Sequence, residues 1–254
     1  MLRKCLGLIV LLTLALGSPA LAQLPTPDPG LYAPDYGTVI AQDTFLRQSL
    51  GQPGSAAEAP ARKPKRGAKM KPKPEPKPTA RQRATLRFGQ DQAVTAKVDQ
   101  VFLEKFAAPG VAPEVVQADL AQLREVAASD IKALGWRPTD LGDIASYCLV
   151  VGWAVVNERT KINRKGAAAV RRAVVDELAL TKAVRRLSDA RQQELAELLL
   201  LRTGYYVGWR NDRLAKGDLV QANVMSEQLR TYVTRVYGVD PGRVKLGSRG
   251  FKKG

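Results

Sequence analysis

Apolar residues recur at intervals of three and four along the chain from residue 90 to about residue 236. This spacing places them on one face of an α-helix, whereas a half-buried strand would show strict alternation. No such alternation persists, and no repeat period is visible. The spacing therefore predicts an all-α fold, as a helical bundle or an orthogonal helical array of about six helices.

Prolines, glycines and capping residues divide this pattern into separate helices. Pro109 and Gly110 end the first helix, and Pro113 suits the first turn of the second. The later helices are expected to begin at Thr139 or Asp140, Asn163, Ser188 and Asp218. The side-chain oxygens of these residue types accept hydrogen bonds from backbone N–H groups at a helix start. Pro241 and the glycines after it predict an irregular tail.

The third predicted helix is expected to be the most buried, because residues 147–156 contain no charge. Cys148 lies on its apolar stripe and is predicted to be a packed core residue, not a reactive thiol. Tyr205 and Trp209 have helical spacing beside arginines. Such aromatic residues can hold sugars or single-stranded bases, but their spacing favours packing in the core.

The segments before the helical domain (residues 84–254) have a different composition. Residues 51–83 hold ten basic and two acidic side chains, and residues 71–78 alternate proline with charged residues. Alternating proline prevents a helix, so this segment is predicted to be a disordered, Pro/Lys-rich linker with polyproline II character. Its composition is similar to the spacer of TonB-type proteins. Residues 23–50 are expected to be extended, with a short helix possible over 39–50.

Residues 1–22 have the pattern of a cleavable signal peptide. Arg3 and Lys4 precede twelve uncharged residues, and Ala20 and Ala22 place small side chains before a cut at Gln23. The apolar run is shorter than the roughly 20 residues of a membrane-spanning helix. We therefore expect an exported protein, periplasmic or extracellular, with no integral span after cleavage. The alternative is an uncleaved anchor, which would make the chain a TonB-like bridging protein.

The composition excludes many catalytic sites. The chain has no histidine and only two cysteines, of which Cys5 lies in the predicted signal peptide. These counts exclude Ser-His-Asp and Cys-His sites, histidine-bearing zinc sites and a disulfide within the mature chain. No phosphate-binding glycine motif occurs either. We therefore assign no catalytic residue, no cofactor and no metal.

Two pairs of carboxylates leave one enzymatic alternative open. Asp140 with Asp143, and Glu194 with Glu197, are each three residues apart on a helical face. Paired acids can hydrolyse glycosidic bonds when their environments differ. A carboxylate-dependent envelope hydrolase would use Asp143 and Glu194. The simpler interpretation is a favourable helix start for the first pair and a solvated face for the second.

Basic residues outnumber acidic ones by 40 to 24, which gives a net charge of +16. Such a charge favours anionic partners. One cluster has no acid between its ends, and it is the candidate anion-binding site: Arg159, Lys161, Arg164, Lys165, Arg171 and Arg172. The leading hypothesis is an exported, non-enzymatic module that binds anionic cell-envelope polymers or a protein partner. A solvated loop and helix face is the alternative for this cluster.

Several short motifs carry a family resemblance. They are Leu134-Gly135, Thr139-Asp140 leading to Asp143, Tyr147 and Trp153, and the closing Gly238-Val239-Asp240 with Gly250-Phe251. Over roughly residues 84–251 the chain resembles an uncharacterised family of exported bacterial proteins, known as a domain of unknown function. The resemblance implies export and a helical fold, and it implies no active site.

Overall fold

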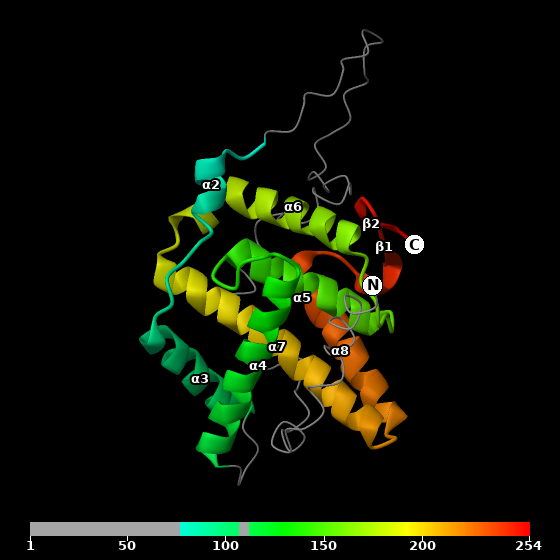
Figure 1. Cartoon of the computed structure of the whole chain (residues 1–254). Coiled ribbons are helices and arrows are strands. Elements are labelled where there is room, and N and C mark those ends of the chain that lie inside the picture. Colours follow the sequence, from blue (N-terminus) through cyan, green and yellow to red (C-terminus); the bar gives the residue numbers. More distant parts are fainter. Residues whose placement is uncertain (1–76, 107–111) are drawn as a thin grey trace, which may run out of the picture.

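The structure, a computed structural model, describes residues 77–106 and 112–254, and in this part the chain is mostly helical (Figure 1). Most of the predicted linker, and the segments before it, lie outside the described residues. The all-α prediction is confirmed. The elements are α2 (Ala80–Ala84), α3 (Gln92–Phe106), α4 (Pro113–Ala133), α5 (Leu141–Val156), α6 (Arg164–Leu180), α7 (Asp189–Ala215), α8 (Leu219–Tyr237), β1 (Val244–Gly247) and β2 (Gly250–Lys253).

Helix α5 is the central element of the fold. The side chain of Asp140 accepts hydrogen bonds from the N–H groups of Gly142 and Asp143 and so begins the helix. Fourteen of its 16 residues are buried, because α6, α7 and α8 all contact it (Figure 1). Cys148 is fully buried, and burial raises the pKa of its thiol to about 12. The predictions of a buried third helix and an unreactive core cysteine are confirmed.

Helices α7 and α8 form a long antiparallel hairpin beside α5. The turn between them has Gly217 in the left-handed region at φ +74°, and Asp218 then caps α8. Tyr205 and Trp209 of α7 are buried, as predicted, and the Tyr205 ring forms a T-shaped contact with the Phe102 ring of α3, with ring centres 6.3 Å apart. The α7–α8 pair therefore supplies much of the core that surrounds α5.

The structure differs from the sequence predictions at both ends of the helical domain. The expected irregular tail contains an antiparallel β-hairpin, β1–β2, in which Leu246 lies opposite Phe251. Helix α2 occupies residues that, except for Ala84, we assigned to the linker. Its start is a capping box, in which Thr79 and Gln82 bond each other's backbone N–H groups. Both elements are short, so helical periodicity does not reveal them.

Candidate anion-binding face

Helix α6 begins inside the predicted basic cluster. The side chain of Asn163 accepts from the N–H groups of Lys165 and Gly166, at 3.0 and 3.2 Å. The predicted N-cap is confirmed. The same bonds occupy two of the backbone N–H groups at the start of α6, so any anion here would depend mainly on side-chain cations.

Arg171 differs from the rest of the cluster because it is engaged inside the fold. Its Nε lies 2.5 Å from Oδ1 of Asp143, and its Nη2 lies 3.1 Å from Oδ2. The Arg137 N–H also donates to Asp143, at 2.7 Å, and the Arg171 guanidinium lies 5.9 Å from the centre of the Trp136 ring. Arg171 therefore neutralises a fully buried carboxylate. The other five members are exposed: Arg159, Lys161, Arg164, Lys165 and Arg172.

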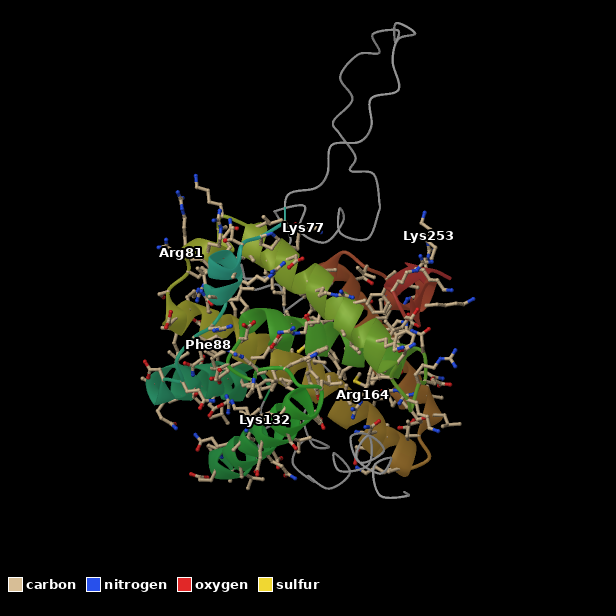
Figure 2. All side chains as sticks on the ribbon, turned by 45° about the horizontal axis from the view of Figure 1, so that its top comes forward. Lys77, Arg81, Phe88, Lys132, Arg164 and Lys253 are labelled. Atoms are coloured by element: carbon tan, nitrogen blue, oxygen red, sulfur yellow. The ribbon has the colours of Figure 1, made fainter. Side chains whose placement is uncertain are left out.

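The β-hairpin brings a second group of cations to the start of α6. A Cβ atom at Gly166 would lie 2.3 Å from the carbonyl oxygen of Gly247, so this close contact requires glycine. A Cβ atom at Gly250 would lie in van der Waals contact with Ala169, and the φ of +98° there also favours glycine. Figures 1 and 2 show the hairpin beside the end of α6 that carries Arg164. The hairpin contributes four exposed cations: Lys245, Arg249, Lys252 and Lys253.

We call these nine side chains the basic face: the five exposed members of the cluster and the four cations of the hairpin. None of the nine forms an ion pair with a described carboxylate. Lys245 and Lys252 are direct cross-strand partners. We did not predict from the sequence that the hairpin contributes cations to this face. The absence of any acidic residue after Asp240 does indicate an excess of positive charge there.

Several contacts hold the hairpin in place on the helices. The indole N–H of Trp153 donates to the carbonyl of Val244 at 2.9 Å, and its ring lies 6.0 Å from that of Phe251. At the base, Asp240 accepts two bonds from Arg230, at 2.7 and 2.8 Å. These bonds lower the pKa of Asp240. The hairpin cations are thus carried on an anchored element.

The predicted carboxylate pairs are engaged in ion pairs and caps. Glu194 contacts Arg191 at 2.6 Å and Lys97 at 3.2 Å. Burial acts to raise the pKa of Glu194, but its hydrogen bonds to these two cations lower it overall. Burial and the nearby Asp143 raise the pKa of Asp140, which caps α5. Asp143 has 0 % exposure, and the side chains of Glu194 and Glu197 are 9 % and 14 % exposed, so both pairs are largely buried.

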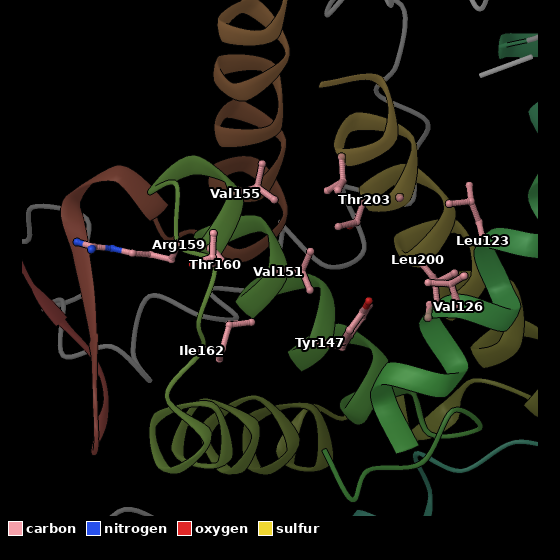
Figure 3. A pocket seen from close by; sticks show the side chains of 14 residues that line it. Leu123, Val126, Tyr147, Val151, Val155, Arg159, Thr160, Ile162, Leu200 and Thr203 are labelled. Atoms are coloured by element: carbon pink, nitrogen blue, oxygen red, sulfur yellow. The ribbon is translucent and has the colours of Figure 1, made fainter. Parts of the chain in front are cut away.

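A separate apolar groove lies next to the basic face (Figure 3). Helices α4, α5 and α7 form its walls, and residues of the connection between α5 and α6 line one end. The groove has a cavity volume of about 90 Å³. Its lining includes Leu123, Val126, Val151, Ile162 and Leu200. Because these residues come from four separate segments, helical periodicity marks them only as general core positions.

Neither a membrane-spanning helix nor a group of metal ligands was found in the described part of the chain. Within residues 77–106 and 112–254, no helix combines the length and apolarity needed to span a bilayer. In the same residues, no three or more acidic or cysteine side chains gather closely enough to hold a metal ion.

The fold and this face define a helical domain with a C-terminal β-hairpin and a surface rich in cations. A family model described as "Family of unknown function (DUF6683)" matches residues 1–253, and the chain belongs to this family. The predicted resemblance to a domain of unknown function is thereby confirmed, and the match begins well before residue 84. No curated protein and no solved structure matches the chain.

Proposed function

We propose that this protein is an exported, non-enzymatic module that binds anionic polymers of the cell envelope through the basic face. One observation carries the proposal: two segments distant in sequence, each without an acidic residue, meet at the start of α6. The segments are residues 159–175 and 241–254. Their contact at Gly166 and Gly247 brings two modest clusters of cations next to each other.

The like charges on this face lower the stability of the fold when no anion is bound. Like charges directly opposite each other on an antiparallel pair destabilise it by about 0.2–1 kcal/mol. Lys245 and Lys252 are in this relation, and no described carboxylate pairs with either one. A polyanion would relieve the repulsion, and its repeated charges would contact several cations at once.

The N-terminal part of the chain supports an envelope location. Its first 22 residues have the signal-peptide pattern, so export places the basic face among polymers outside the cytoplasm. The ten basic residues of segment 51–83 would add to the attraction for the same polymers.

Binding of the full chain to isolated cell walls and to polyphosphate tests the proposal. The test variant replaces Lys245, Arg249 and Lys252 with glutamine. The control variant replaces Lys182, Arg185 and Arg186, three exposed cations near the end of α6 remote from the hairpin. Both variants lose the same charge, so a nonspecific effect of net charge would weaken them equally.

We expect the test variant to bind polyphosphate at least tenfold more weakly, and the control to change less than threefold. Binding by the unmodified chain should weaken steeply as salt rises, because the cations are exposed. Equal loss in the two variants, or no retention at low salt, would overturn the proposal.

A further inference from the structure

The walls of the apolar groove have few groups that can form hydrogen bonds with a ligand. Tyr147 and Thr203 are among its polar lining residues. The Tyr147 hydroxyl donates to Asp130 at 3.1 Å, and the Thr203 hydroxyl donates to the Leu199 carbonyl at 2.8 Å. A peptide entering the groove would bring backbone N–H and C=O groups that need partners. The walls are therefore suited to hydrocarbon.

The size of the groove is also suited to part of a flexible chain. Its volume of about 90 Å³ compares with the roughly 10–15 Å³ that one water molecule needs by the same kind of measure. The space is lined by residues of α4, α5, α7 and the connection between α5 and α6 (Figure 3). A linear acyl chain can lie along such a groove and leave its headgroup outside.

The groove is continuous with the basic face through the connection between α5 and α6. Arg159 and Ile162 of this connection line its end, and Lys161 lies between them in sequence. In Figure 3 the side chain of Arg159 leaves the rim and points away from the apolar walls. No carboxylate is among the lining residues. A headgroup emerging at this rim would meet positive charge.

We propose that the groove binds one acyl chain of an amphiphile whose headgroup is anionic, with Arg159 and Lys161 contacting the headgroup. The inference rests on the proposed function, because it places the headgroup at the basic face and the acyl chain beside it. The ligand class is thus an acylated anion, such as the lipid end of an envelope polymer. Charge complementarity at the rim selects this class over a neutral or cationic amphiphile.

Calorimetric titration of the full chain with alkyl phosphates below their micelle concentrations tests the inference. Ethyl, octyl and dodecyl phosphate share a headgroup and differ in chain length. Each methylene that enters the groove should strengthen binding about fourfold. Polyphosphate, which has no acyl chain, is titrated in parallel as the probe of the basic face alone.

Two variants reduce the space in the groove. Val151→Trp and Ile162→Trp each place a large ring at a half-buried lining position. The control is Val224→Trp, at an exposed position on α8 outside the groove. We expect dodecyl phosphate to bind either groove variant at least tenfold more weakly, with the control and all polyphosphate affinities unchanged. Circular dichroism checks folding, and the two groove positions serve as independent tests.

A charge variant then tests the headgroup contact. Arg159→Gln should weaken dodecyl phosphate at least fivefold and leave dodecyl maltoside, an uncharged amphiphile, unaffected. Equal affinity for ethyl and dodecyl phosphate, or equal behaviour of the groove and control variants, would overturn the inference. Polyphosphate binding in that case would leave the proposed function standing. Failure of the unmodified chain to bind polyphosphate would overturn the proposed function instead.

Discussion

Two regions of the molecule use the same charged residue types in opposite ways. Where α3, α4 and α7 meet, Arg124 lies 2.5 Å from Asp99 and 2.9 Å from Glu197, and both acids are largely buried. On the basic face, cations from two segments gather without a described acidic partner. Paired charges hold helices together, whereas unpaired charges remain available to an external anion. The comparison separates charges that stabilise the fold from charges suited to binding.

The largest effect is expected where a paired charge is removed from the interior. Asp143→Ala should destabilise the protein by about 2–3 kcal/mol, because it leaves the buried end of Arg171, whose side chain is 35 % exposed, and the Arg137 N–H without their partner. Urea unfolding measures the change. Asp189→Ala, at an exposed helix start, is the control and should cost less than about 1 kcal/mol. A loss below about 1 kcal/mol for Asp143→Ala would contradict a structural role for this pair.

A half-buried acid without a described cationic partner should give a smaller, pH-dependent effect. Burial raises the pKa of Asp130 to about 6, against an opposing hydrogen bond from Tyr147. The folded state therefore favours the neutral acid, and stability should fall as pH rises from about 4 to 6. Asp130→Asn should remove this fall and should be more stable than the unmodified protein at pH 7.5, by up to about 1 kcal/mol after solvent screening.

Thermal unfolding at pH 4 and at pH 7.5 measures this difference. At pH 4 the two proteins should be nearly equal, because the acid is then neutral and the amide can still accept from Tyr147. A variant that is less stable at both pH values would show that the ionised carboxylate stabilises the fold, which is the opposite of the expected sign.

The smallest effect is expected on the basic face, where the change should be a gain in stability, opposite in sign to the loss for Asp143→Ala. Replacing Lys245 and Lys252 with glutamine should stabilise the protein by about 0.2–1 kcal/mol, because it removes a cross-strand repulsion. The same variant should bind polyphosphate more weakly. Urea unfolding at low and high salt measures the first effect, and the stability gain should shrink as salt screens the charges. Loss of stability would show that the lysines stabilise the hairpin.

The features predicted well from the sequence depend on nearby residues. Asp140, Asn163 and Asp218 begin helices as expected, because a capping side chain bonds N–H groups only two or three positions away. Cys148 is buried as expected, because its own helix is apolar on nearly every side. Local spacing is sufficient for such features.

The features that were missed depend on distant contacts. The hairpin has only short strands, and its position against Gly166 depends on a meeting of segments about 80 residues apart. The pairing of Arg171 with Asp143 joins α5 to α6, and neither residue's neighbours indicate it. The groove likewise requires four segments to be assembled. Composition can indicate an excess of cations, but only the fold determines which of them share a surface.

The bond between Trp153 and Val244 also has a spectroscopic consequence. The chain has three tryptophans, and the indole of Trp153 contacts the hairpin through both its N–H and its ring. With Trp136 and Trp209 replaced by phenylalanine, the emission of Trp153 would report on the local environment where the hairpin meets the helices. Detachment of the hairpin would expose this indole to water and shift its emission to longer wavelength. The fluorescence of Trp153 would thus report whether the hairpin, which carries four cations of the basic face, is attached to the helices.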